Sequence, residues 1–176
     1  MDKERVTVFD SAIGWMAAAW LDTRVMGMTF GHSSPIVALA NLRSGVDEPS
    51  SPDRFMKRLV TRLRGVAKGR CGDAFDDVEI DTAGMTAFQQ SVVKHCRRIP
   101  VGETMSYGEL AQRAGHARAA RAVGRVMSCN RFPLIVPCHR VVSSNSLGGF
   151  SSPNGLKMKR RLLDAEAAHS TKRIGV

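Results

Sequence analysis

Three short apolar runs follow one another between residues 6 and 30. The segments "DSAIG" and "LDTR" separate these runs, and both are rich in residues that favour turns. This alternation of apolar runs and turn signals predicts an antiparallel meander of three strands. A later segment, "FDDVEIDT", predicts one further short strand.

Two amphipathic helices are expected between the meander and that last strand. "SSPIVALANLRSG" offers Ser34 as the N-cap and Pro35 in the first turn. "SSPDRFMKRLVTRLRGVAKG" repeats the arrangement with Ser51 and Pro52. No pattern in this half of the chain points to a reaction centre, so we expect it to be a scaffold.

Helical patterning dominates the second half. Thr86 and Gln89 fit a Thr-x-x-Gln capping box, and the following apolar stripe includes Cys96, which we expect to be a core residue. Ser106 and Glu109 fit a second capping box. Gly115 then ends that helix, and a short turn leads into another helix from about residue 117.

This last helix combines an arginine face with small side chains. Arg118, Arg121 and Arg125 fall within an arc of about 60° on an ideal helix, and alanines and glycine reduce its bulk. The pair of helices therefore predicts a helix–turn–helix whose second helix approaches a nucleic-acid groove. From these residues alone, a tight helix–helix contact explains the small side chains equally well.

The distribution of charge strengthens the first interpretation. The 176-residue chain carries a formal net charge of +10. Residues 1–82 hold 11 Lys and Arg against 12 Asp and Glu, whereas residues 83–176 hold 15 against 4. A basic half joined to a neutral half indicates a polyanion-binding domain with a scaffold domain, and we place the boundary near residue 82. The alternative is that the excess charge serves solubility.

Composition excludes several other classes of protein. No run of about 18 apolar residues is present and no signal-peptide pattern opens the chain, so we expect a cytoplasmic protein with no membrane partner, or a nuclear one in a eukaryote. The four cysteines are expected to be reduced. No cysteine or histidine spacing suits zinc, so no metal and no dissociable cofactor are expected.

One short segment carries candidate chemistry. In "IVPCHRVVSSNSLGGF", Cys138 and His139 are adjacent behind an apolar run. A thiol needs a base or a cation nearby to become a nucleophile at neutral pH. On an extended chain the two side chains would point to opposite faces, so a sharp backbone turn or a bridging water would have to connect them.

A distant carboxylate is a candidate to orient that histidine. Glu166 falls on the apolar stripe of the predicted C-terminal helix, where a carboxylate needs a partner. The alternative is a surface glutamate that pairs with Lys159 on the same arc.

Together these segments resemble a known family. "PCHRVV", the preceding Asn130, "SYGELA" and "ARAARAVGRVM" are similar to the O6-alkylguanine-DNA alkyltransferases, also called methylated-DNA–protein-cysteine methyltransferases. The resemblance is strong from Thr86 to about Glu166 and general in the first half. It implies an α/β domain with a small antiparallel sheet, followed by a mostly helical, winged-helix-like domain with a helix–turn–helix.

The resemblance also implies roles for individual residues. Cys138 would accept the alkyl group from guanine O6 in a single turnover, His139 would act as base through a water, and Glu166 would orient His139. Asn130 would fix the turn at the active site, and Tyr107 would help to rotate the nucleotide out of the helix and protonate guanine N3.

The partner implied is double-stranded DNA that contains O6-alkylguanine, bound by a monomer, with O4-alkylthymine and cooperative binding left open. Arg121 would enter the base stack, Ser151 would bind near O6, and Val141 would present its backbone to the guanine edge. The remaining expected DNA-binding residues lie on or beside the two predicted helices: Ser106, Arg118, Ala120 and Arg125.

Some positions depart from the family pattern. Phe150 stands where many relatives carry tyrosine, Ser152-Pro153 stiffens the same loop, and Arg131 stands where proline is common. These leave the preferred size of the alkyl group open. Cys129 is expected to be packed. A non-reactive damage-binding protein and a cysteine hydrolase are the rival functions; the first conflicts with Cys138, and the second leaves the basic helices unexplained.

Overall fold

The computed structural model describes residues 3–42, 44–46, 48–70 and 73–174. The chain forms two compact units. The first contains Met1–Asp81 together with Arg131–Pro133, and the second contains Thr82–Asn130 and Leu134–Val176. No helix in the described part of the chain is both long and apolar enough to cross a membrane.

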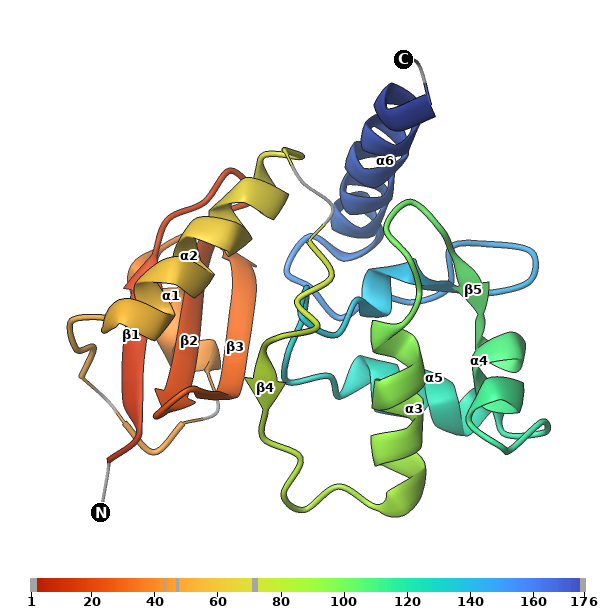
Figure 1. The fold of residues 1–176 in the computed structure, drawn as a ribbon, viewed down its shortest axis with the longest axis horizontal. Coiled ribbons are helices and arrows are strands. Elements are labelled where there is room, and N and C mark those ends of the chain that lie inside the picture. The colour runs from red at the N-terminus through yellow and green to blue at the C-terminus, as the bar shows by residue number, and fades with distance from the viewer. Residues whose placement is uncertain (1–2, 43, 47, 71–72, 175–176) are drawn as a thin grey trace. The chain divides into compact units, whose positions relative to one another are not determined.

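The first unit is built on a four-stranded sheet with the order β1-β2-β3-β4 (Figure 1). Its strands are β1 (Arg5–Phe9), β2 (Trp15–Leu21), β3 (Arg24–His32) and β4 (Glu79–Ile80). The first three form the predicted antiparallel meander. The expectation of a purely antiparallel sheet is wrong, because β4 runs parallel to β3. The chain reaches β4 after a helical crossover, which returns it in the direction of β3.

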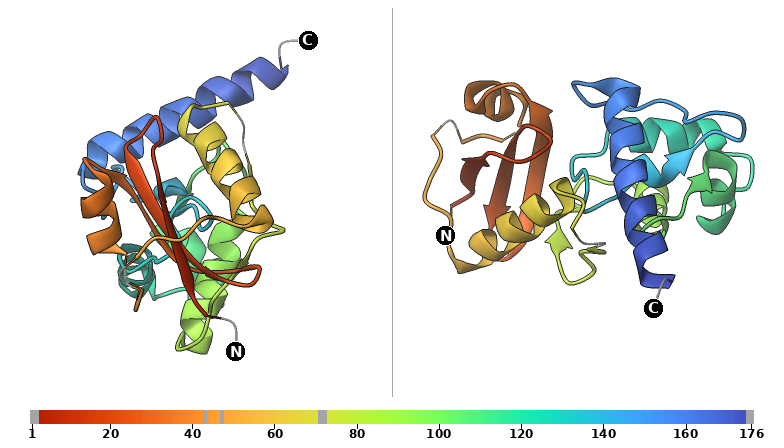
Figure 2. Two further views of the ribbon diagram at one scale, coloured as in Figure 1. Left: turned by 90° about the vertical axis from the view of Figure 1, so that its left-hand side faces the viewer. Right: turned by 90° about the horizontal axis from the view of Figure 1, so that it is seen from above.

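Two helices cover opposite faces of this sheet, α1 (Pro35–Asn41) and α2 (Arg54–Ala67) (Figure 2). Burial on both faces explains why β2 is buried at successive positions and lacks a polar–apolar alternation. Ala17 and Ala19 of β2 pack with Ala38 and Leu42 on the α1 side. The predicted Ser34 cap of α1 is confirmed, since its hydroxyl accepts a hydrogen bond from the Val37 amide at 3.2 Å.

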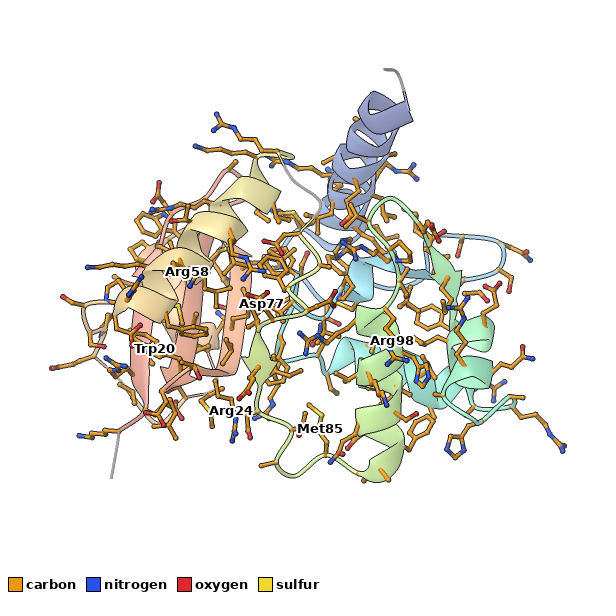
Figure 3. The ribbon with its side chains drawn as sticks, viewed as in Figure 1. Trp20, Arg24, Arg58, Asp77, Met85 and Arg98 are labelled. Carbon is orange, nitrogen blue, oxygen red and sulfur yellow. The ribbon has the colours of Figure 1, made fainter. Side chains whose placement is uncertain are left out.

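The α2 helix begins later than the sequence predicted. Its N-cap is Asp53, which accepts the Met56 amide at 2.9 Å, and not Ser51. Asp53 also accepts the indole N–H of buried Trp20 at 3.0 Å and pairs with Arg5. Trp20 is labelled in the first unit in Figure 3. The Asp53 carboxylate accepts hydrogen bonds from both the helix N-terminus and the buried indole. A cap at Ser51 would leave the indole N–H without this acceptor.

The second unit contains three helices that pack against one another: α3 (Ala87–Arg97), α4 (Tyr107–Arg113) and α5 (Ala120–Ser128). Both predicted capping boxes are confirmed, Thr86 with Gln89 on α3 and Ser106 with Glu109 on α4. Two short strands, β5 (Met105–Ser106) and β6 (Val141–Val142), pair in parallel. The one-turn 3-10 helix η1 (Cys138–Arg140) precedes β6, and the long helix α6 (Gly155–Ile174) follows it.

Helix α5 is shorter than predicted. It begins at Ala120 after the cap residue Ala119, which makes no side-chain capping bond. Arg118 therefore lies in the connection before the helix, and the expected common arc contains Arg121 and Arg125 alone. The expected start near residue 117 is wrong. Residues 116–119 form a separate turn, in which the Ala119 amide donates to the His116 carbonyl, and the helix begins only after it.

The three residues that follow Asn130 belong structurally to the first unit. The Met28 amide of β3 donates to the Arg131 carbonyl at 2.8 Å, and the Arg131 guanidinium donates to the carbonyl and carboxylate of Asp81 at 3.3 Å each. The guanidinium also lies 5.3 Å from the centre of the Phe132 ring. The chain thus leaves the second unit at Asn130 and returns to it at Leu134.

Candidate active site

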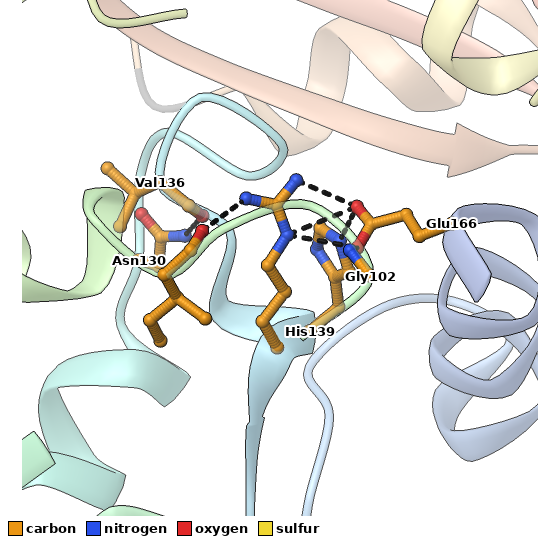
Figure 4. Close-up of polar contacts among 7 residues, drawn as sticks. Gly102, Asn130, Val136, His139 and Glu166 are labelled. Atoms are coloured by element: carbon orange, nitrogen blue, oxygen red, sulfur yellow. Dashed lines mark hydrogen bonds and ion pairs between the residues drawn. The ribbon is translucent and has the colours of Figure 1, made fainter. Parts of the chain in front are cut away.

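A tight turn positions Cys138. Pro137 has φ −79° and ψ 65°, the conformation of an inverse γ-turn, and the Cys138 amide donates to the Val136 carbonyl at 2.8 Å. The Asn130 side-chain amide donates to the same carbonyl at 2.9 Å (Figure 4). The Pro137 ring restricts φ to the value that this turn needs. The hydrogen bond from Asn130 to the Val136 carbonyl stabilises the same turn.

The histidine next to Cys138 faces the distant carboxylate. His139 Nε2 and Glu166 Oε1 lie 2.8 Å apart, and both residues are buried. Burial opposes ionisation of Glu166, but hydrogen bonds from His139 and Arg140 lower the pKa of Glu166 to about 2. Because the ionised carboxylate accepts, His139 Nε2 carries the proton, and Nδ1, which has no partner in the described part of the chain, keeps its lone pair.

Arg140 completes the surroundings of Glu166. Its guanidinium donates to both carboxylate oxygens at 2.8–3.2 Å and to the Ile99 carbonyl at 2.8 Å. The Gly102 amide adds a hydrogen bond at 3.1 Å (Figure 4). The alternative of a surface glutamate paired with Lys159 is therefore wrong, since Glu166 is buried and is fully engaged with other groups.

Lys159 supports the other side of the turn. It is completely buried, and its Nζ donates to the Val141 carbonyl at 2.6 Å and to the Gly149 carbonyl at 3.2 Å. The ammonium lies 6.0 Å from the centre of the Tyr107 ring and 5.8 Å from that of Phe150. Burial lowers the pKa of Lys159, and the charge of Cys138 as a thiolate opposes this shift. Lys159 thus joins α6, β6 and the loop before α6.

The electrostatics favour a neutral sulfur and a neutral imidazole at neutral pH. Burial raises the pKa of Cys138, and a hydrogen bond from Asn130 and the positive charge of Lys159 oppose this rise. Burial also lowers the pKa of His139, although Glu166 opposes the change. A neutral imidazole can accept a proton, which is the state that activation of a thiol requires.

A cavity of about 80 Å³ opens in front of the sulfur. Cys138 is 9% exposed, and this cavity is where it can be approached. The walls combine α4, α5 and the loop before α6, and the lining residues are Tyr107, Gly124, Met127, Ser128, Cys138, Gly149, Phe150 and Ser151. The structure therefore brings three predicted site residues, Tyr107, Cys138 and Ser151, together around one space.

The other predicted DNA-binding residues lie outside the cavity. Arg121 and Arg125 are exposed on α5, and Arg118 is exposed just before it. Ala120 is half-buried in the first turn of α5. Two predicted residues have structural partners as well: Ser106 caps α4, and the carbonyl of buried Val141 accepts from Lys159.

The remaining cysteines have different surroundings. Cys96 is buried in α3, as predicted. The expectation that Cys129 is packed is wrong, because it is exposed at the C-cap of α5. Cys71 lies outside the described residues. Within the described ranges, no three histidine, cysteine or acidic side chains gather in a way that could hold a metal ion.

The sequence did not predict the structural roles of two residues at the site, Arg140 and Lys159. Arg140 was read as part of the family motif without a role of its own, and Lys159 was considered as a partner for Glu166. A signal existed for Lys159, because it occupies the same apolar stripe as Met158, Leu162 and Glu166. A charged residue on a buried stripe needs partners whichever sign it carries.

Comparison with known proteins places this arrangement in a family. Residues 87–168 match the family model described as the DNA-binding domain of 6-O-methylguanine DNA methyltransferase. A methylated-DNA–protein-cysteine methyltransferase of Mycolicibacterium paratuberculosis is 36% identical over 157 residues, which cover 85% of this chain and 92% of that protein. The chain belongs to the methylated-DNA–protein-cysteine methyltransferases.

Further relatives agree with this assignment. The methylated-DNA–protein-cysteine methyltransferase of Methanothermobacter thermautotrophicus is 39% identical over 118 residues, which cover 66% of this chain and 64% of that relative. A crystal structure of the Mycobacterium tuberculosis protein OGT in complex with DNA has a TM-score of 0.74 and 34% identity, with 93% of both chains covered. The similarity to that structure extends over both units of this methyltransferase-family chain.

Proposed function

We propose that this protein repairs DNA by transferring the alkyl group of O6-alkylguanine directly and irreversibly to Cys138. The observation that carries the proposal is the position of the Cys138 sulfur. The sulfur faces a cavity whose wall includes the arginine-bearing helix α5, and the next residue, His139, is held by the buried Glu166 carboxylate. Nucleophile, base and binding helix thus share one small region.

DNA binding is assigned to α4 and α5, acting as the helix–turn–helix of a winged-helix-like domain. α5 presents Arg121 and Arg125 to solvent, and Arg118 precedes it. Its remaining exposed positions are small, which allows close approach to a groove. Since O6 of a stacked guanine cannot reach a sulfur within a cavity, the damaged nucleotide has to rotate out of the duplex. Arg121 would occupy the space left in the base stack.

The transfer balances without a cofactor. A water relays the proton of the Cys138 thiol to His139 Nδ1, and the sulfur attacks the alkyl carbon. The new bond joins sulfur and carbon, the bond between carbon and O6 breaks, and its electron pair remains on guanine. Guanine then gains one proton from Tyr107, and the proton held by His139 restores the phenol, so the thiol proton ends on guanine.

The surroundings of Tyr107 suit this role. Burial, with a smaller contribution from the negative charge that Cys138 carries as a thiolate, raises the pKa of Tyr107. The phenol therefore keeps its proton at neutral pH and is able to donate it to the departing base. Ser151 is exposed and lines the cavity, and in this proposal it would bind near O6.

The product is a thioether at Cys138, and no group in the cavity is suited to cleave a carbon–sulfur bond. We therefore expect one transfer per molecule. The test is incubation with duplex DNA containing isotope-labelled O6-methylguanine, followed by mass analysis of peptides and quantification of methyl per protein. A single methyl group on Cys138 is expected.

Two cysteine variants complete the experiment. Cys138→Ala should bind the duplex without accepting methyl, and Cys129→Ala, which removes an exposed thiol at the end of α5, should still accept one group. Methyl on Cys129 or another residue, or several turnovers per molecule, would contradict the mechanism. Normal binding by both variants without transfer by the wild type would establish a damage-binding protein instead.

A further inference from the structure

Gly148 stands against Tyr107 at a distance that leaves no room for a side chain. It has φ +69°, and a Cβ atom built on it would lie 2.9 Å from Tyr107 Cε2, 3.1 Å from the Tyr107 hydroxyl oxygen and 3.2 Å from Ser143 Oγ. Contacts below 3.0 Å require one of the partners to move. The positive φ alone also favours glycine.

The opposite edge of the same ring faces a second glycine. A Cβ atom at Gly124 of α5 would lie 3.9 Å from Tyr107 Cδ1 and Cε1, which is ordinary van der Waals contact. Tyr107 thus stands between α5 on its Cδ1/Cε1 edge and the loop before α6 on its Cε2 edge. The contact with Gly148 is the tighter of the two and limits where the phenol can lie.

The loop that carries Gly148 is held in place by its own hydrogen bonds. The Ser143 amide donates to the Ser146 carbonyl at 3.1 Å, and the Gly148 amide donates to Ser146 Oγ at 3.2 Å. The next carbonyl, that of Gly149, accepts from buried Lys159 at 3.2 Å. A Cβ atom at position 148 would therefore displace the Tyr107 ring more readily than the anchored loop.

We propose that Gly148 is a positioning residue for alkyl transfer: the absence of a side chain there fixes the Tyr107 phenol at the wall of the Cys138 cavity. The inference rests on the proposed function, in which Tyr107 acts on the flipped base. A displaced phenol would enter the cavity or leave the guanine edge. Displacement of a reacting group by about 1 Å costs up to the order of 100-fold in rate.

The test compares the rate of methyl transfer from duplex DNA in Gly148→Ala, Tyr107→Ala and the double variant. Gly148→Ala should slow transfer by about 10-fold to 100-fold. In the Tyr107→Ala background the same change should alter the rate by less than about twofold, because the group through which Gly148 acts is gone. Equal losses in both backgrounds would overturn the proposal.

Gly84→Ala is the matched control for backbone strain. Gly84 has φ +77°, and a Cβ atom there would meet nothing within 4 Å. This variant carries the conformational cost of alanine at positive φ without touching Tyr107. Its rate of transfer should equal that of the wild type. A loss equal to that of Gly148→Ala would mean that strain alone explains the effect, and the proposal would fall.

A second readout is independent of the reaction. Tyr107 is the single tyrosine of the chain, so isotope-labelled tyrosine gives NMR signals from this ring alone. These signals should shift in Gly148→Ala and stay in place in Gly84→Ala; unshifted signals in Gly148→Ala would refute the inference. If the wild type transfers no methyl, the proposed function fails, and the NMR comparison still decides the role of Gly148.

The same three variants also test whether the contact with Tyr107 affects folding. If Gly148→Ala does not fold, the double variant with Tyr107→Ala should fold again, because the opposing ring atoms have been removed. If the double variant does not fold while Tyr107→Ala and Gly84→Ala do, removal of the ring does not relieve the defect at position 148, and the proposal would fall.

Discussion

Replacement of Glu166 by glutamine tests the charge arrangement behind the site. Glutamine keeps the shape of the side chain but leaves the buried Arg140 guanidinium without its counter-ion. The pKa of Glu166 falls from 4.5 to about 2 on folding. At about 1.4 kcal/mol per pH unit this corresponds to about 3 kcal/mol of stability. Loss of one partner of a buried ion pair costs about 3–5 kcal/mol, which is the same range.

The pH dependence follows from the direction of the shift. A carboxyl group whose pKa is lowered on folding stabilises the protein fully above its unfolded pKa, here 4.5, and this contribution disappears as the pH falls towards 2. The difference in stability between wild type and Glu166→Gln should therefore stay constant from pH 6 to 8, about 3 kcal/mol, and shrink steadily below the unfolded pKa.

Urea unfolding followed by circular dichroism measures this difference. Both tryptophans, Trp15 and Trp20, lie in the first unit, so their fluorescence would not report the unit that contains Glu166. Asp164→Asn removes an exposed carboxylate from the same helix and should change stability by less than about 0.5 kcal/mol at every pH. A Glu166→Gln loss no larger than that of Asp164→Asn, or one that persists unchanged at acid pH, would refute the reasoning.

Two further predictions separate the roles of the arginines. Arg121→Ala should slow transfer from duplex DNA at least about 10-fold more than transfer from free O6-benzylguanine, because the free base needs no unstacking; equal losses on both substrates would show that Arg121 does not act in flipping. Arg125→Ala should weaken duplex binding across sequences and reduce the slope of log affinity against log salt by about one, measured by fluorescence anisotropy. An unchanged slope would mean that Arg125 makes no phosphate contact.

Much of the fold was predictable because local signals and tertiary contacts agree. The three meander strands, the Ser34 cap and both capping boxes follow from short-range patterns. The errors arise where a distant group decides. Asp53 replaces Ser51 as a cap because Trp20, 33 residues away, also needs an acceptor. The parallel direction of β4 depends on where the chain re-enters the sheet, which no local pattern states.

The site was predictable in its chemistry but not in its packing. The apolar stripe made Glu166 a candidate but favoured a surface ion pair with Lys159. The resemblance to the family gave Glu166 its role and pointed to Cys138 and His139. Arg140 was not recognised, because its partners Ile99 and Glu166 are 41 and 26 residues away. Gly148 was not recognised either, since its importance lies in the distance to Tyr107, a quantity that exists only in the folded chain.

The excursion of Arg131–Pro133 has a consequence for how this protein can be divided. A fragment cut cleanly between Asp81 and Thr82 would carry this tripeptide away from the β3 amide and the Asp81 groups that hold it. In the second fragment this tripeptide connects Asn130 to the segment that leads to Cys138. The two halves are therefore interleaved along the chain, and a fragment that begins at Thr82 would keep the Asn130–Val136 hydrogen bond but lose the contacts that hold Arg131.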